Sequence, residues 1–421
     1  MTNACKIHGL NSGASLRSVI SLFAGAGGLD LGLEAAGFYT RLCVEIDEDA
    51  QRTLRQNRPA WKISEPGDIH RIAPAEILRQ AGLKPGETTL LAGGPPCQPF
   101  SKSGYWSNGD SGRLKDPRAN TLKAYLEIVE AAIPKVFVLE NVKGLAFDGK
   151  DEGLRLLQRQ IAEINKRVGS KYKPQVIHIN AASYGIPQRR ERIFVLAQRE
   201  GAEFVLPPPT HGPRGEVANS SLEPYMSTWD AIGDLDVDTW TEELEPTGRW
   251  TGLLGSIPEG KNYLWHTPRC GGAPLFGWRT RYWSFLLKLA KNEPSWTIQA
   301  VPGPATGPFH WKNRLLSIKE LCRLQTFPDD YQIAGDRRTA HRQIGNAVPC
   351  ALAEMLGLEI RRQFLCERVR TDLTLLPSRR RTIPPPAPPK RVAARYLPLR
   401  RRRREHPGTG RGPGARKRVT V

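Results

Sequence analysis

Short apolar runs that alternate with amphipathic stretches are the feature that most restricts the fold of this 421-residue chain. Such alternation over about 180 residues is typical of a parallel α/β sheet with helices on both faces. The runs are nearly continuous in apolar residues, as expected of strands covered on both sides. We therefore predict a doubly wound, mostly parallel sheet. Its predicted strands are SVISL (18–22), TRLCVEI (40–46), TTLLAGG (88–94), KVFVLENV (135–142), QVIHIN (175–180) and RIFVLAQ (192–198).

The regular alternation ends near residue 200, where LPPPTHGPRG (206–215) has the composition of a linker. Eight of the ten tryptophans follow between Trp229 and Trp311. We expect a second, smaller and irregular domain there, with most of its aromatic side chains in its core. Helical spacing returns in LLSIKELCRLQTF (315–327) and AVPCALAEMLGLEIRRQFL (347–365).

The net charge of +20 is concentrated at the C-terminal end. Residues 361–421 contain 19 Lys and Arg against three acids, and the rest of the chain is only mildly basic. Because this Arg- and Pro-rich stretch has few large apolar residues, we expect it to be disordered. Two interpretations stay open: a solvated tail without a specific role, and a sequence-independent binder of polyanion phosphates.

The seven cysteines are scattered, without CxxC spacing. That pattern argues against a disulfide framework and a metal site, and indicates buried reduced thiols for most of them. No run of about 18 apolar residues is present, so we expect no membrane span and a site of action inside the cell. Cys97 is the exception among the cysteines, because Pro95, Pro96 and Pro99 surround it and fix its backbone.

A glycine-rich turn, FAGAGG (23–28), follows the first predicted strand and opens a helix. Glycines there let the backbone approach a ligand closely. Glu45, at the end of the second strand, is placed to bind ribose hydroxyls, and Asp68 could receive an adenine amino group. The pattern indicates a cofactor that contains adenosine, without separating NAD from other nucleosides. A tight turn with surface acids is the alternative.

Cys97 and Glu140 also follow predicted strands, so they should meet the glycine turn at the carboxyl edge of the sheet. A nicotinamide dehydrogenase has no need of this thiol and carboxylate together. An enzyme that activates an electron-poor ring does, because a thiolate can add to the ring while an acid hydrogen-bonds the ring nitrogen. The prolines would then hold the nucleophile in position.

Six motifs in order resemble the DNA (cytosine-5) methyltransferases, in particular the bacterial type II restriction–modification enzymes. They are FAGAGG (23–28), GGPPCQPFS (93–101), ENV (140–142), QRRER (188–192), RLQTFPDDY (323–331) and RQIGNAVP (342–349). The resemblance implies the class I S-adenosylmethionine-dependent methyltransferase fold. The organisation we expect is an N-terminal extension (1–17), a catalytic and cofactor-binding domain (18–200), a target-recognition domain (201–310), the C-terminal part of the catalytic domain (311–366) and the disordered tail (367–421).

The resemblance also assigns catalytic roles. Cys97 would attack C6 of cytosine, and Glu140 would hold N3 and the exocyclic amine. Arg192 would bind the cytosine O2, with Arg190 bracing the site. Loss of the C5 proton after methyl transfer would then expel Cys97 by β-elimination.

S-adenosyl-L-methionine is the implied methyl donor, and no metal is expected. Phe23 would stack on the adenine, and Asn346 would reach the methionine side after the C-terminal helices fold back onto the first domain. The remaining predicted cofactor residues are Gly25, Gly27, Glu45, Asp68, Ile69 and Pro96.

The implied partner is double-stranded DNA, from which the target cytosine is rotated out of the stack. A Gly/Ser/Lys-rich loop (101–120) would close over the DNA, with an ordinary surface loop as the alternative. Region 201–310 would contact base edges in the major groove. The predicted DNA-binding residues are Gln98, Ser101, Gln188, Arg249, Arg279 and Arg281, with Lys261, Asn262 and Arg269 as further candidates.

We further expect a monomer in the bacterial cytoplasm that protects host DNA from a cognate restriction endonuclease. Three alternatives remain: an RNA cytosine methyltransferase, a non-catalytic DNA-binding regulator and, as the weakest, a nicotinamide dehydrogenase. The long recognition region favours DNA over RNA, and the intact Cys97, Glu140 and Arg192 argue against a regulator.

Overall fold

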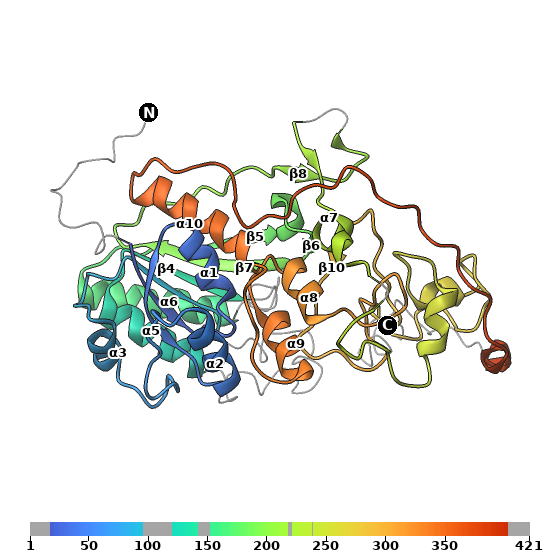
Figure 1. Ribbon diagram of the computed structural model, residues 1–421. Helices are drawn as coiled ribbons and strands as arrows, with labels where there is room; N and C mark the ends of the chain where they lie inside the picture. The colour runs from blue at the N-terminus through green and yellow to red at the C-terminus, as the bar shows by residue number, and fades with distance from the viewer. Residues whose placement is uncertain (1–16, 96–119, 142–151, 218–220, 238, 403–421) are drawn as a thin grey trace, which may run out of the picture.

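A six-stranded sheet forms the centre of the computed structural model, which describes residues 17–95, 120–141, 152–217, 221–237 and 239–402 (Figure 1). The strand order is β2-β1-β3-β4-β7-β5. Strands β2, β1, β3 and β4 are parallel, and β7 runs antiparallel to both β4 and β5. The predicted doubly wound, mostly parallel sheet is confirmed. The strands are β1 (Ser18–Leu22), β2 (Tyr39–Val44), β3 (Leu90–Gly93), β4 (Val136–Asn141), β5 (Gln175–Asn180) and β7 (Glu191–Gln198).

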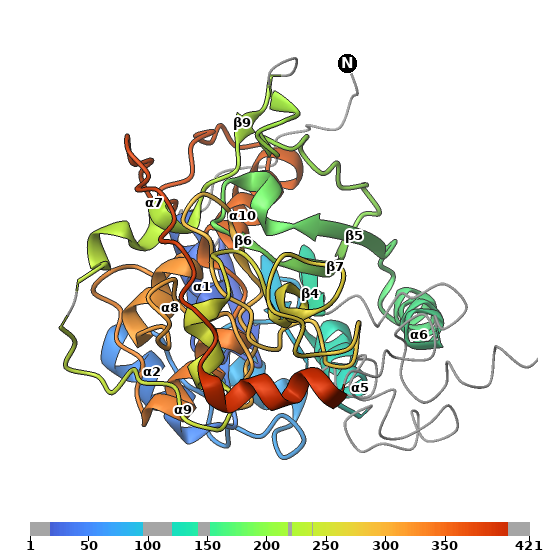
Figure 2. The same ribbon diagram turned by 90° about the vertical axis from the view of Figure 1, so that its right-hand side faces the viewer.

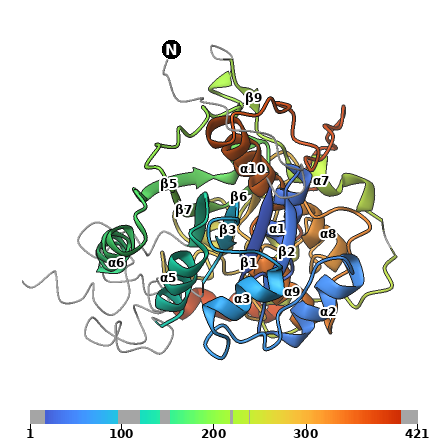
Figure 3. The ribbon, with the colours of Figure 1, turned by 90° about the vertical axis from the view of Figure 1, so that its left-hand side faces the viewer.

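Helices cover both faces of the sheet because successive strand residues point to opposite sides. In β1, Ile20 and Leu22 join one core cluster, and Val19 joins the other. The first cluster packs beneath α3 (Pro74–Ala81), α5 (Asn120–Ala132) and α6 (Glu152–Val168). The second packs beneath α1 (Gly28–Ala35) and α10 (Cys350–Phe364), as Figure 3 shows. This double burial explains the nearly continuous apolar strand sequences.

The C-terminal helices return to the first domain. Helix α10 lies against α1 so closely that a Cβ on Gly32 would lie 2.2 Å from the Cys350 carbonyl oxygen. A third core cluster joins α2 (Glu48–Asn57) to α8 (Ile318–Leu324) and α9 (Arg337–Asn346). Residues near both ends of the described chain therefore build one domain.

The smaller domain has little regular structure and its own core. That core contains Tyr263, Phe276, Phe285 and Phe309. By contrast, Ala231 and Ile232 of the preceding helix pack with the third cluster. The short elements between residues 181 and 296, in the smaller domain and in the chain that leads to it, are η3 (Ala181–Tyr184), β6 (Gln188–Arg189), β8 (His211–Gly212), β9 (Glu223–Pro224), α7 (Thr228–Ile232), η5 (Gly233–Leu235), η6 (Thr251–Ser256), η7 (Tyr263–His266) and β10 (Ser295–Trp296).

The C-terminal segment 367–402 differs from the disordered tail expected over 367–421. It leaves α10, crosses the large domain and ends in the 3₁₀ helix η8 (Ala394–Arg402) beside the small domain (Figures 1 and 2). Leu373, Leu375 and Leu376 pack against the second core cluster, and Tyr396 enters the small-domain core. These few apolar side chains anchor a segment whose average composition suggests disorder. Residues 403–421 lie outside the described residues.

The cysteines agree only partly with the expectation of buried reduced thiols. Cys43, Cys322 and Cys350 are free and buried, whereas Cys270 is free and exposed. Cys366, just beyond α10, is exposed and disulfide-bonded. The expectation of a reduced thiol is therefore wrong at Cys366, where the surrounding fold does not enclose the side chain.

Candidate active site

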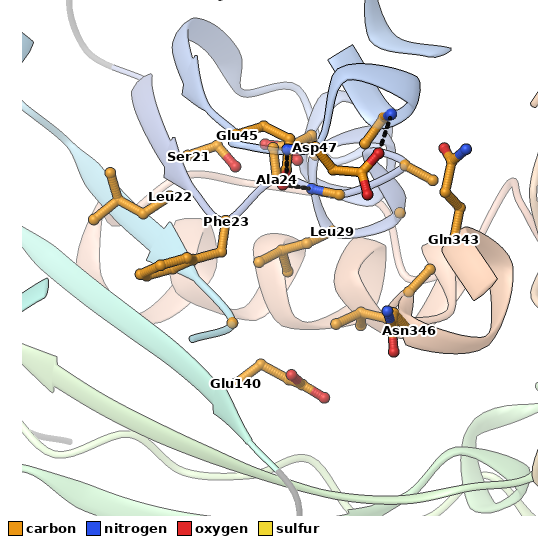
Figure 4. Close-up of a pocket in the computed structure, with 18 of the residues that line it drawn as sticks. Ser21, Leu22, Phe23, Ala24, Leu29, Glu45, Asp47, Glu140, Gln343 and Asn346 are labelled. Atoms are coloured by element: carbon orange, nitrogen blue, oxygen red, sulfur yellow. Dashed lines mark hydrogen bonds between the residues drawn. The ribbon is translucent and has the colours of Figure 1, made fainter. Parts of the chain in front are cut away.

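A cavity of about 450 Å³ opens at the carboxyl ends of β1, β2 and β4 (Figure 4). The glycine turn after β1 and the end of α9 form much of its wall. Figure 4 shows Glu140 on the opposite side of the cavity from Glu45. Its lining combines apolar and polar groups, among them Phe23, Gly25, Leu29, Asp30, Glu45, Asp47, Gly94, Pro95, Glu140, Arg192, Gln343, Asn346 and Val348.

Glu45 holds the glycine turn in place. Its Oε2 accepts the Gly25 N–H at 2.6 Å, and its Oε1 accepts the Asp47 N–H at 2.8 Å. Phe23 and Gly25 both have positive φ, at 56° and 55°. A phenylalanine in this conformation carries strain, which is common at ligand sites. Burial raises the pKa of Glu45, while the two N–H donors oppose that rise.

Gly27 supports the same turn from behind, as the left-handed residue that precedes α1. A Cβ there would lie 2.8 Å from a Leu54 methyl group. Gly27 thus allows the turn to pack closely on α2.

Arg190 is completely buried and connects three parts of the chain. It donates to the carbonyl oxygens of Gly345 at 2.7 Å, Ala347 at 2.9 Å and Ile298 at 3.1 Å. Burial lowers the pKa of this guanidinium well below its usual value, and Arg192 lowers it further. Because Arg190 donates hydrogen bonds to the residues on both sides of Asn346, it positions a wall of the cavity without lining the cavity itself.

Glu140 and Arg192 form an ion pair at the edge of the cavity. Arg192 Nε lies 2.7 Å from Glu140 Oε1, and both side chains are almost buried. In the antiparallel register, Glu140 faces Phe194 across β4 and β7, so Arg192 is its diagonal neighbour on the same face. The sheet therefore brings together two residues that are 52 positions apart in sequence.

Asp30 also lines the cavity, and the sequence interpretation missed it. It is fully buried, and neither carboxylate oxygen has a hydrogen-bond partner among the described residues. Burial raises the pKa of Asp30 to about 6. The sequence feature that indicates a special role for this residue is an acid between Leu29 and Leu31 on a short apolar helix.

Asp68 and Ile69 do not line this cavity. Asp68 lines a neighbouring one of about 340 Å³, which shares Ile46 with the first, and it accepts the His70 N–H at 2.9 Å. Ile69 is buried in the core. Pro96, Cys97, Gln98, Ser101 and the proposed loop as far as residue 119 lie outside the described residues.

Gln188, one of the predicted DNA-binding residues, is fully buried in the structure. Its side chain donates to Gln325 Oε1 at 3.0 Å and to the Leu324 carbonyl at 3.2 Å. Asn262 is likewise buried, where its amide donates to the Trp283 carbonyl. Both amides therefore satisfy backbone groups of the folded chain.

The arginines predicted to contact DNA are exposed on the small domain. The Arg249 and Arg281 guanidiniums lie 4.2 and 5.6 Å from the centroid of the Trp250 ring. Arg279 lies 5.9 Å from the centroid of Trp278. Cation–π contacts at these distances orient the guanidiniums on the aromatic rings. Lys261 and Arg269 are exposed as well.

No helix in the described part of the chain is long and apolar enough to cross a membrane. Within the same ranges, no group of three or more His, Cys, Asp and Glu could hold a metal ion.

The fold and the cavity define a class I methyltransferase. The structure resembles that of the Entamoeba histolytica methyltransferase EhMeth with a TM-score of 0.54 at 18% identity, covering 82% of this chain and 98% of that chain. At this identity the likeness shows the fold alone.

The family model for C-5 cytosine-specific DNA methylases matches residues 17–362, and the chain belongs to this family. One relative is the type II methyltransferase M.SacI of Streptomyces achromogenes, 41% identical over 364 residues, which are 80% of this chain and 91% of the relative. Another is the type II methyltransferase M.NgoFVII of Neisseria gonorrhoeae, 34% identical and covering 82% and 86%. The protein is a DNA cytosine-5 methyltransferase of the type II class, as the sequence predicts.

Proposed function

We propose that the protein methylates C5 of one cytosine in a short double-stranded DNA site, after that cytosine has rotated out of the helix. Cys97 is the proposed nucleophile. The observation that carries the proposal is the Glu140–Arg192 pair at the edge of a cavity that Gly94 and Pro95 also line. Two residues of chain span at most about 7 Å, so Cys97 follows Pro95 at close range.

The cavity fits S-adenosylmethionine, the methyl donor that the family implies. Its volume and its mixture of apolar and polar walls suit a ligand with an adenine ring and an amino-acid end. The buried Asp30 side chain adds a polar group to this wall. Phe23, Glu45 and Asn346 would hold the cofactor, with the backbone of Gly25 beside it.

The proposed reaction begins with addition of the Cys97 thiolate to C6 of the cytosine. Glu140 supplies a proton to N3, and Arg192 holds both Glu140 and the O2 oxygen of the base. Electron density then moves to C5, which becomes nucleophilic. The bound cofactor supplies an electrophilic methyl group for this carbon. Removal of the C5 proton reforms the ring double bond and releases Cys97 by β-elimination.

The biological role that we propose is protection of host DNA from a cognate restriction endonuclease. The support comes from the relatives, which are named type II methyltransferases. Exposed arginines on the small domain support its role as the target-recognition domain.

The test starts from bisulfite sequencing of plasmid DNA from cells that express the protein, which identifies the methylated site. A duplex with 5-fluorocytosine at that position then serves as a trap, because fluorine at C5 prevents the final elimination. With S-adenosylmethionine present, we expect a covalent complex that survives denaturation. Cys97→Ser should form none while still binding the duplex.

Cys270→Ser is the matched control, since Cys270 is a free and exposed thiol in the small domain. It should form the adduct like the unmodified protein. An adduct that persists in Cys97→Ser would refute the assignment of the nucleophile. Adduct formation with RNA in place of DNA would refute the proposed substrate.

A further inference from the structure

The C-terminal strap, defined as residues 367–402, makes different kinds of contact with the protein in its two halves. Its first half uses arginines in ion pairs with the body of the protein. Arg370 pairs with the buried Glu354, Arg379 with Glu223, and Arg380 with Asp234. These three pairs fix the course of the strap across the large domain, as Figure 1 shows.

The second half of the strap is built into the small domain. The Lys390 N–H donates to the Gly255 carbonyl at 2.8 Å. Tyr396 is only 5% exposed, and its hydroxyl donates to the Arg249 carbonyl at 2.8 Å. Its ring lies nearly parallel to Trp250, with centroids 6.5 Å apart and an interplanar angle of 18°. The strap therefore supports the aromatic ring beneath two of the predicted DNA-binding arginines.

Three exposed guanidiniums gather on this pair of rings. Arg249 and Arg281 lie over Trp250, and Arg395 lies over Tyr396 with 4.9 Å between its guanidinium carbon and the ring centroid. Arg395 also packs so closely on Gly252 that a Cβ there would meet it at 2.2 Å. We call Arg249, Arg281 and Arg395 the arginine cluster.

The arginine cluster has no counter-charge among the residues that the structure describes. Within the described ranges, no carboxylate lies within 4 Å of any of the three guanidiniums, unlike those of the first half of the strap. Like charges held together on a surface repel one another, so the arrangement is favourable only when an anion binds. Guanidiniums held on aromatic rings present planar sets of donors that match phosphate oxygens.

We propose that the arginine cluster binds the phosphate backbone of duplex DNA beside the target site, with Arg395 of the strap as a sequence-independent contact. This proposal rests on the proposed function, because it assumes that the small domain faces the DNA. It assigns to the strap the phosphate-binding role left open by its composition. Tyr396 is then a positioning residue that holds Trp250 in place.

The test is the salt dependence of binding to a duplex that carries the methylated site. Each phosphate contact contributes about 0.9 to the slope of log K against log salt concentration. Arg395→Gln should make the slope shallower by that amount. When salt rises from 50 to 200 mM, the variant should therefore lose about 3.5-fold less affinity than the unmodified protein does. The sequence that is methylated should not change.

Two variants separate charge from packing. Arg395→Lys keeps the positive charge and should retain the original slope, whereas a merely structural role would not be rescued by lysine. Arg368→Gln is the matched control, an exposed arginine at the other end of the strap, and should leave the slope unchanged.

An unchanged slope in Arg395→Gln would overturn the proposal, and so would an altered slope in Arg395→Lys. The 5-fluorocytosine trap at low salt distinguishes failure of the role proposed for the strap from failure of the proposed catalytic function. If the unmodified protein forms the adduct and Arg395→Gln keeps the same slope, only the role of the strap fails. If the unmodified protein forms no adduct, the proposed catalytic function fails.

Discussion

Replacing Glu45 by Gln should weaken binding of S-adenosylmethionine by about 30- to 150-fold. Both carboxylate oxygens already accept backbone N–H groups of the turn, at 2.6 and 2.8 Å. The remaining lone pairs are those that we expect to accept the two ribose hydroxyls. Hydrogen bonds to a charged group contribute about 1.5–3 kcal/mol, against about 0.5–1.5 for neutral pairs. Two weakened bonds therefore cost about 2–3 kcal/mol, which gives the stated factor.

Isothermal titration calorimetry of the full chain measures this change directly. Glu34→Gln is the control, because Glu34 pairs with Arg58 on the outside of α1 and does not line the cavity. Burial raises the pKa of Glu45, so affinity should fall with decreasing pH earlier than for an ordinary glutamate. In Glu45→Gln this pH dependence should be absent. A change of less than threefold in a folded variant would refute the ribose assignment.

Two further predictions concern buried cations. Arg190→Met removes the guanidinium that donates to the Gly345, Ala347 and Ile298 carbonyls. We therefore expect a loss of about 2–4 kcal/mol of stability and at least tenfold weaker S-adenosylmethionine binding, measured by denaturant unfolding and calorimetry. Arg189→Met, at an exposed ion pair with Glu293, is the control, and equal losses in both variants would contradict the assigned role. Burial lowers the pKa of Lys288 to about 8. Unfolded lysine titrates near 10.4, so the unfolded chain binds more protons between pH 8 and 10.4, and the stability contribution of this group rises with pH there by up to about 3 kcal/mol. Lys288→Met should remove that rise. A pH dependence of urea unfolding between pH 7 and pH 10 that is the same in the variant and in the unmodified protein would disprove the account.

The sheet could be predicted because its signal is local. Each strand is covered on both faces, so burial leaves a continuous apolar run in the sequence. The sequence TLKAYLEIVEAAIP (121–134) likewise has helical spacing, and helix α5 ends at Ala132, shortly before Pro134. Because sites in such a sheet lie at the carboxyl ends of its strands, the sequence also predicts that Glu45 and Glu140 line one cavity, and they do.

The features that the sequence does not reveal depend on distant partners. Gln188 stands in a motif rich in charged groups, and its burial follows from contacts with Leu324 and Gln325, more than 130 positions away. The strap was mistaken for a disordered tail because composition averages over the segment. Tyr396 anchors it through one aromatic partner, and an average cannot register a single contact of this kind.

The position of Asn346 and Val348 in the cavity wall has a consequence for how the enzyme is made. The glycine turn leaves the ribosome about 300 residues before the segment that completes the methyl-donor pocket. A nascent chain therefore emerges with its first half ready to fold but without a finished pocket. Translation that stops before α9 yields a product that lacks this part of the cavity wall, so we expect that product to be inactive.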